Sequence, residues 1–388
     1  MKYAHIVGWG SYLPERVLTN DDLALIVNTS DEWIHTRTGI RERRIAGEKE
    51  TTATLAFEAA AKALVRANMH PSQIELIIVA TSTPEYIFPS TASQVQDYLG
   101  AVRAGAFDLS AACSGFIYAL DMAKQAIATE SVQNALVIGA ETMSRVLDWQ
   151  DRGTCILFGD GAGAVVLKGS SVPGGVLASA LHSDGSGGNL LTLPAVYQTS
   201  MPMLGADYRY NGRQKNTIHM NGRQVFRFAT KVVSESIEEV LKKANLTPND
   251  VDLIVPHQAN IRIIETAAKR LSIDPDKFFV NVDKVGNTSA ASIPIALCDA
   301  VRAGRLAPDM NVVFVGFGGG LTWGATVIRW DVTPPEVSSL DRQWKRARYV
   351  SARVRSRLRK IGRKMGAWLA GSPTPQARLR DADKQKKE

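Results

Sequence analysis

Buried-strand patterns and helical patterns alternate along most of the chain. Continuous apolar runs that end in glycine, ALVIGA at 135–140 and NVVFVGF at 311–317, predict buried strands. The segment TTATLAFEAAAKALVRAN at 51–68 predicts a helix, because threonine precedes a series of alanine-rich turns. This alternation of strands and helices predicts a layered α/β architecture.

An internal repeat has a constant offset of 177 residues. ANMHPSQIELIIVA at 67–80 aligns with ANLTPNDVDLIVPH at 244–257, and ALVIG at 135–139 aligns with VVFVG at 312–316. SAACSGFIYAL at 110–120 falls on TSAASIPIAL at the same offset. We therefore predict a duplicated α/β unit, with one half over residues 1–170, the other over 171–331, and an active site where the halves meet.

The pattern changes after Trp330. Residues 332–340 include VTPPEVSS and predict a linker, and residues 341–388 predict a basic amphipathic helix followed by a disordered polar tail. In the predicted helix, apolar residues recur every three or four positions: Ala347, Val350, Val354, Leu358, Ile361, Met365 and Trp368. Residues 336–388 hold 16 Lys and Arg against 5 Asp and Glu, whereas the rest of the chain holds 30 against 33. The net charge of +8 therefore belongs to the tail, which argues against nucleic-acid binding by the whole chain.

Length and composition exclude several classes of protein. The chain has 388 residues, 45% of them apolar and 22% charged, which is typical of a globular protein and not of a disordered or collagen-like one. The apolar runs are far shorter than the roughly 20 residues that cross a bilayer, and the N-terminus does not resemble an export signal. Three scattered cysteines, Cys113, Cys155 and Cys298, predict neither a disulfide framework nor a metal site. We therefore expect a cytoplasmic protein.

Three residues stand out as candidates for chemistry. Cys113 lies where small residues lead into a helical pattern, and a thiol at a helix N-terminus is favoured as a nucleophilic thiolate. His257 ends a predicted strand, where α/β folds place functional groups. Asn287 lies in a small-residue turn that corresponds, in the repeat, to the Cys113 segment. Each also has an ordinary structural interpretation: a buried small side chain, a hydrogen-bonded core histidine and a turn residue.

Two further groups of residues need weighing. FGDGAG at 158–163 and GFGGG at 316–320 do not match a phosphate-binding loop, and we interpret both as tight strand connections, the second with backbone amides that can receive an oxyanion. Trp33, Arg37 and Arg152 are able to stack on a base and bind phosphate, although a solvated charged segment also explains them.

Taken together, six ordered motifs resemble β-ketoacyl-acyl-carrier-protein synthase III, in the thiolase-like superfamily. They are DEWIHTRTGIRERR, AACSGF, DRGTCILFGDGAGA, HQANIRI, VGNTSAASIPIAL and GFGGGLTWGA, spread over residues 1–331. The resemblance implies an α/β/α/β/α fold of two duplicated halves, to which this chain adds the basic extension. It also implies a homodimer and the initiating step of fatty acid synthesis. In that step an acyl-CoA, here with acetyl or another short primer, condenses with malonyl-acyl carrier protein, without a cofactor and with loss of CO₂.

The resemblance also implies roles for particular residues. Cys113, His257 and Asn287 form the catalytic triad, and the backbone amides of Cys113 and Gly319 form the oxyanion hole. Four residues bind CoA: Trp33, Arg37, Arg152 and Asn260. The carrier protein docks on Gln258, Ala259, Asn260, Ile261, Arg262 and Arg227. The acyl pocket is lined by Met143, Phe158, Phe317 and Phe88, the last reaching across the dimer.

Rival interpretations remain open at this level. A specialised synthase that primes a polyketide or secondary-metabolite pathway carries the same triad. A catalytically silent binding module does not need Cys113, His257 and Asn287 together. The basic extension at 341–370 predicts a helix on an anionic membrane surface, with an acidic partner, packing on the dimer or a solubilising role as alternatives.

Overall fold

The computed structural model describes residues 1–194 and 217–331, together with Leu358, Ile361, Gly362 and Met365 of the extension. The linker and nearly all of the predicted basic helix lie outside the described residues. Two sheets carry the described fold. The first has the order β1-β7-β6-β4-β5, with bounds Tyr3–Tyr12, Asp160–Ser170, Asn134–Thr142, Leu76–Ala80 and Gly105–Leu109. The second has the order β11-β12-β13-β8, with bounds Leu253–Pro256, Met310–Gly318, Thr322–Trp330 and Gly175–Ser183.

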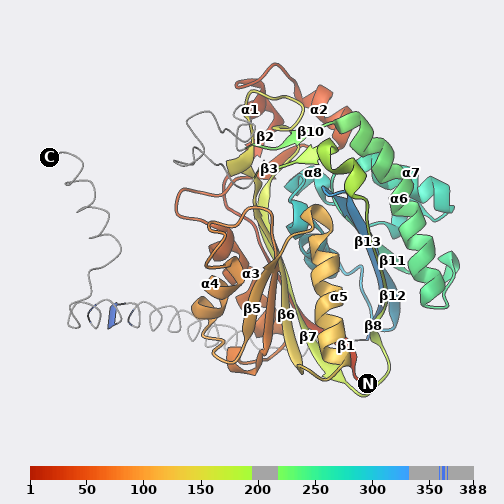
Figure 1. Cartoon of the computed structure of the whole chain (residues 1–388). Coiled ribbons are helices and arrows are strands. Elements are labelled where there is room, and N and C mark those ends of the chain that lie inside the picture. Colours follow the sequence, from red (N-terminus) through yellow and green to blue (C-terminus); the bar gives the residue numbers. More distant parts are fainter. Residues whose placement is uncertain (195–216, 332–357, 359–360, 363–364, 366–388) are drawn as a thin grey trace, which may run out of the picture.

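The helices form three layers around these sheets (Figure 1). On the outer face of the first sheet lie α3 (Thr52–Arg66) and α4 (Thr91–Leu99), and on that of the second lie α6 (Gly222–Lys243) and α7 (Ile261–Leu271). Between the sheets lie α5 (Gly115–Ala128) and α9 (Ser292–Arg302), which are apolar enough to be buried on most sides. The predicted five-layer α/β/α/β/α fold is thus confirmed.

The remaining short elements lie around this framework. They are α1 (Asn20–Ala24), α2 (Asp31–Thr38), α8 (Val282–Val285) and the strand pairs β2 (Val17–Thr19) with β3 (Glu42–Arg44) and β9 (Leu191–Thr192) with β10 (His219–Met220). Short 3-10 helices precede α5 and α9, namely η2 (Ala112–Ser114) and η7 (Ser289–Ala291).

The structure repeats itself at the offset seen in the sequence. β4 begins at Leu76 and β11 at Leu253, and the turns η2 and η7 begin at Ala112 and Ser289. Ala112 and Ser289 also share a left-handed backbone, with φ of 45° and 49°, which non-glycine residues adopt only when the surroundings impose it. The two halves therefore place two equivalent turns against each other between the sheets.

One local prediction was wrong. FGDGAG at 158–163 is not a tight connection, because β7 begins at Asp160 and runs on to Ser170. A Cβ at Gly163 would lie 2.7 Å from the backbone of Pro294 and Ile295, so glycine lets α9 pack directly on the strand. GFGGG, in contrast, does end β12 and lead into β13, as expected for a tight connection.

Candidate active site

Cys113 lies in the turn η2, just before α5 begins at Gly115. Its side chain is buried, at 6% exposure, and its Sγ–H donates to Ser289 Oγ at 3.5 Å. The predicted position at the start of a buried helix is confirmed. The contact with Ser289 joins the nucleophile turn of one half to the equivalent turn of the other.

The end of β12 supports this turn from the opposite side. A Cβ at Gly318 would lie 2.6 Å from Cys113 N and 3.2 Å from Cys113 Cβ. Thr322 Oγ1 lies 3.0 Å from both Ala111 O and Gly319 O, and Ser114 Oγ donates to it at 2.8 Å. Gly319 is therefore held beside the Cys113 turn, where its N–H is a candidate oxyanion donor.

We expect Gly318→Ala to slow acyl transfer to Cys113 by at least about tenfold. The new methyl group must push the nucleophile turn away from its position, an overpacking that typically costs about 1–3 kcal/mol of stability. Rapid-quench mass spectrometry of acyl loading and thermal unfolding measure the two effects. Gly185→Ala is the matched control, because nothing lies within 4 Å of a Cβ at that position. Equal loading by both variants would contradict the close fit.

Asn287 lies in the turn between α8 and η7, beside Phe158. Its backbone N–H donates to Leu157 O at 2.8 Å, and its backbone oxygen accepts the Gly159 N–H at 3.0 Å. Its side-chain Oδ1 accepts the Ser289 N–H at 2.9 Å, so the amide presents its Nδ2 donor group away from η7. Two half-one loop residues thus hold an asparagine that half two contributes.

His257 follows β11 directly, and its backbone N–H donates to Val315 O at 2.8 Å. Its ring packs edge-on against Phe317, with centroids 5.2 Å apart, and Phe317 immediately precedes the Gly318 that touches Cys113. Burial lowers the pKa of His257 to about 3. The imidazole is therefore neutral at ordinary pH and able to donate one N–H hydrogen bond.

Burial opposes the thiolate that the helix N-terminus favours at Cys113. The pKa of the Cys113 thiol is raised to about 12, mainly by burial; the Ser289 hydrogen bond lowers it, and the charge of Glu141 adds a smaller rise. Placement at a helix N-terminus favours a thiolate by a smaller amount than desolvation opposes it. The resting nucleophile is therefore a protonated thiol.

The predicted nucleotide-binding residues come together on the surface. The Arg37 guanidinium lies 4.5 Å from the Trp33 ring centroid, and so does that of Arg152, which also donates to Asn28 O at 3.0 Å. Both cations therefore already stack on Trp33. A base that stacks between Trp33 and Arg152 has to displace the Arg152 side chain.

The segment 258–262 divides into a buried and an exposed part. Gln258 is fully buried, and its side chain bonds to Pro256 O, Phe279 O and the N–H groups of Asn281 and Val282. The prediction that Gln258 contacts a carrier protein is therefore corrected: it anchors the loop. Ala259, Asn260 and Ile261 are half-buried, and Arg262 and Arg227 are exposed.

Asn260 has a structural role. Its Oδ1 accepts the Arg262 N–H at 2.9 Å and so caps α7, while its Nδ2 donates to Arg37 O at 2.9 Å. It therefore ties the first turn of α7 to the helix that carries Trp33. A pantetheine contact by Asn260 stays a prediction.

The predicted acyl-pocket residues fall into two environments. Met143 and Phe158 are buried in one small cluster with Leu147 and Ile218, and Phe317 is buried against His257. Phe88, in contrast, is 86% exposed. Within a single chain, Phe88 does not close a pocket.

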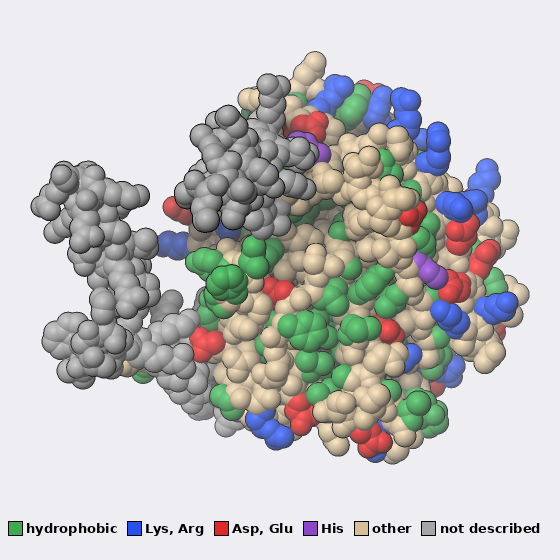
Figure 2. All heavy atoms as spheres, viewed as in Figure 1, with side chains coloured by type: hydrophobic (Ala, Val, Ile, Leu, Met, Phe, Trp, Pro, Cys, Tyr) green, Lys and Arg blue, Asp and Glu red, His purple; other side chains and the backbone are tan. Residues whose placement is uncertain are grey.

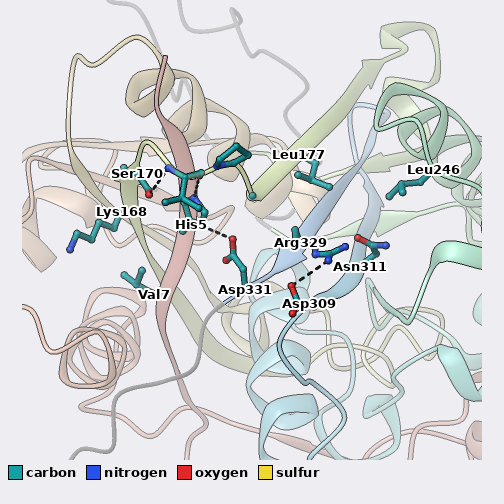
Figure 3. Close-up of a pocket in the computed structure, with 14 residues that line it drawn as sticks. His5, Val7, Lys168, Ser170, Leu177, Leu246, Asp309, Asn311, Arg329 and Asp331 are labelled. Carbon is teal, nitrogen blue, oxygen red and sulfur yellow. Dashed lines mark hydrogen bonds and ion pairs between the residues drawn. The ribbon is translucent and has the colours of Figure 1, made fainter.

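A surface groove of about 890 Å³ lies away from this site (Figure 3). Its lining includes two pairs of polar side chains, His5 with Asp331 at 2.7 Å and Arg329 with Asp309 at 3.3 Å. Over residues 1–194 and 217–331, no His, Cys, Asp and Glu side chains cluster in a way that could hold a metal ion. In the described part of the chain, no helix combines the length and apolarity needed to cross a bilayer.

Sequence reasoning missed three supports of the site: Ser289, Glu141 and Thr322. Ser289 Oγ donates to Glu141 Oε1 at 3.0 Å, and Glu141 is fully buried at the end of β6. The internal repeat could have pointed to two of them. At the offset of 177 residues, Ser289 corresponds to Ala112 beside the nucleophile, and Glu141 corresponds to Gly318. The end of β6 therefore supports the turn η7 of the second half, and the end of β12 supports the turn η2 of the first half.

Comparison with known proteins places this geometry in a family. Residues 107–185 match the family model described as 3-oxoacyl-[acyl-carrier-protein] synthase III, and residues 241–330 match the model of its C-terminal part. A β-ketoacyl-[acyl-carrier-protein] synthase III of Caldanaerobacter subterraneus subsp. tengcongensis is 52% identical over 327 residues, covering 84% of this chain and 98% of the relative. That of Clostridium acetobutylicum is 49% identical and covers 85% and 99%.

Solved structures agree with these matches. The crystal structure of 3-oxoacyl-[acyl-carrier-protein] synthase III from Aquifex aeolicus has a TM-score of 0.78 and 49% identity, covering 84% of this chain and 99% of that one. The priming β-ketosynthase of the R1128 polyketide pathway has a TM-score of 0.78 and 36% identity, with coverage of 86% and 98%. The motifs, the two-halved fold and these matches agree over about residues 1–331, and the chain belongs to the 3-oxoacyl-[acyl-carrier-protein] synthase III family.

Proposed function

We propose that this condensing acyltransferase initiates fatty acid synthesis by joining a short acyl primer from acyl-CoA to malonyl-acyl carrier protein. Cys113 accepts the acyl group as a thioester, after which malonyl-acyl carrier protein enters. Neutral His257 and the Asn287 amide donate hydrogen bonds to the malonyl thioester oxygen and stabilise the enolate left by loss of CO₂. The enolate carbon attacks acyl-Cys113 and gives 3-ketoacyl-acyl carrier protein. The thioesters supply the chemistry without a cofactor.

One observation carries this proposal: the two equivalent turns bring Cys113 and the Asn287–Ser289 segment into contact between the halves, and Phe317 joins His257 to the same point. The test mixes the enzyme with acetyl-CoA and malonyl-acyl carrier protein and follows the mass of the carrier protein. Formation of acetoacetyl-carrier protein supports the proposal. Loading from acyl-carrier proteins but from no CoA thioester would favour the polyketide-priming alternative, which the lower identity of 36% to such an enzyme makes the second choice.

We propose that the carrier protein docks beside α6 and α7. Arg227 and Arg262 are exposed there, and Arg262 stacks on Phe226 with its guanidinium 5.5 Å from the ring centroid. Figure 2 shows Lys and Arg side chains gathered on the upper right of the molecule, where Figure 1 places these helices. A basic surface next to the His257 loop suits an acidic carrier protein, mainly by speeding encounter.

We also propose that two copies pair through β5, the edge strand of the first sheet. Phe107 on β5 and Ile87 and Phe88 in the loop between β4 and α4 are 44%, 69% and 86% exposed, and Figure 2 shows hydrophobic side chains gathered on this face. An exposed apolar edge strand is a liability that pairing with a second copy removes. In such a dimer, Phe88 is free to enter the partner's acyl pocket, where its bulk favours a short primer.

Ile87→Asp together with Phe107→Lys is therefore expected to give a monomer. Charges on both exposed apolar positions oppose burial of this edge. Sedimentation velocity measures the outcome. Val172→Asp, which changes an apolar residue 65% exposed elsewhere, is the matched control and is expected to leave the dimer intact. A dimer in the double variant would contradict the β5 interface.

For the basic extension we propose binding to an anionic membrane surface. Leu358, Ile361 and Met365 are helical and exposed, and they follow the apolar spacing predicted from sequence among many Lys and Arg residues. We expect the full chain, and not a 1–335 truncation, to float with vesicles that contain phosphatidylserine. Flotation of both forms or of neither would reject the membrane proposal.

A further inference from the structure

The resting state of Cys113 poses a chemical problem. The thiol is buried and its pKa is raised to about 12, yet a thiolate is needed to attack a thioester. No cation takes part in the contacts that the structure describes at its sulfur. His257 has a pKa lowered to about 3, which makes it a poor proton acceptor at neutral pH. Another group has to accept the thiol proton.

A continuous hydrogen-bonded chain leads away from the sulfur. Cys113 Sγ donates to Ser289 Oγ at 3.5 Å, and Ser289 Oγ donates to Glu141 Oε1 at 3.0 Å. Both bonds run in the same direction, from thiol to hydroxyl to carboxylate. Their three residues come from η2, η7 and the end of β6, which pack together between the two sheets.

The surroundings of the Glu141 carboxylate favour its acceptance of a proton. It is fully buried, and uncharged donors hold its carboxylate: Thr81 Oγ1 at 3.2 Å, Thr83 Oγ1 at 2.5 Å and the Ser82 N–H at 3.1 Å. No Lys or Arg donates to it among the described contacts, so burial dominates and raises its pKa to about 7. The charge of Glu141 in turn raises the pKa of Cys113, so the two groups influence each other.

We propose that Glu141, acting through the Ser289 hydroxyl, takes the proton of Cys113 during acylation and returns it when the acyl group leaves. This inference deepens the proposed function, on which it rests. Ser289 is the relay and Glu141 the final proton acceptor. His257 and Asn287 keep their separate task at the malonyl thioester.

The proton balance closes over one turnover. In acylation, the Cys113 proton passes to Ser289 Oγ, the Ser289 proton passes to Glu141, and the sulfur forms a bond to the acyl carbonyl carbon. The bond from that carbon to the CoA sulfur breaks, and the CoA thiolate takes a proton from water. In condensation, the enolate carbon attacks, the bond to Cys113 breaks, and Glu141 returns its proton through Ser289 to the sulfur.

The test measures single-turnover acylation of the full chain by acetyl-CoA between about pH 6 and pH 9. The wild-type rate is expected to rise with pH and level off once Glu141 is ionised, near pH 7 by its raised pKa. Glu141→Gln and Ser289→Ala are expected to load about 100-fold more slowly at neutral pH. Their rates should keep rising about tenfold per pH unit, because only direct ionisation of the thiol then supplies the nucleophile.

Thr81→Val is the matched control. It removes a different hydrogen bond to the same carboxylate but lies outside the path to Cys113. It is expected to keep a plateau, reached at a pH no lower than in the wild type because the carboxylate loses one donor. Glu141→Asp is expected to restore part of the plateau. If Glu141 has only a structural role, the Glu141 and Ser289 variants will lose the same fraction of the acylation rate at every pH. That result would overturn the relay. If Glu141→Gln fails to fold, the profile of Ser289→Ala decides. A wild-type enzyme that never loads acetyl would instead refute the proposed function.

Discussion

Replacing Cys113 with alanine is expected to abolish both acyl loading and condensation, with a loss on the order of 10⁴-fold or more. A mechanism through a covalent intermediate has no route without its nucleophile. The Cys113 side chain is small and buried, so alanine fits the site and little loss of stability is expected. Intact-protein mass spectrometry after mixing with a panel of acyl-CoAs measures the result, and the acyl group that loads fastest identifies the primer.

The chain supplies its own controls for this experiment. Cys155 and Cys298 are also free and buried. Cys155→Ala and Cys298→Ala are expected to gain one acyl group as the wild type does. If Cys113→Ala still gained an acyl group, or if either control variant failed to gain one, Cys113 would not be the nucleophile.

His257→Ala is expected to keep acyl loading within about tenfold of wild type but to lower malonyl decarboxylation and condensation by 10²- to 10³-fold, roughly the value of one oxyanion donor. The two steps separate because, among the described contacts, Ser289 bonds to the Cys113 sulfur and passes the hydrogen-bonded chain on to Glu141, whereas His257 does not take part in it. Release of labelled CO₂ from malonyl-acyl carrier protein measures the second step. His182→Ala, on β8 and paired with Glu239, is the control histidine. An equal loss of loading in His257→Ala would contradict this division of roles.

The buried His257 also makes stability depend on pH. Its folded pKa is lowered to about 3, below the roughly 6.5 of an unfolded histidine, so between these values the unfolded chain binds a proton that the folded chain refuses. Stability from this group is therefore complete above about pH 6.5 and is lost as the pH falls. From pH 7 to pH 5, wild type should lose about 2 kcal/mol of unfolding free energy relative to His257→Ala. Urea unfolding at both pH values measures the difference.

Much of the fold could be read from the chain because its signals are local or periodic. The apolar runs at 135–140 and 311–317 are inside β6 and β12, and the helix predicted at 51–68 is α3 with Thr51 as its cap. The repeat offset of 177 residues survives as equal spacing between η2 and η7. Local spacing also placed Cys113 before a helix and His257 after a strand.

Only the tertiary structure decided which distant groups meet and how far each is removed from water. Glu141, Ser289 and Cys113 lie in separate segments, so no local pattern announces their chain of hydrogen bonds. Gln258 looks like a surface residue of its loop until packing encloses it. The raised pKa of Cys113 likewise follows mainly from desolvation, which sums over every neighbour in the folded chain. Sequence periodicity thus determined the elements and their order, whereas the packing of the two halves set the chemistry between them.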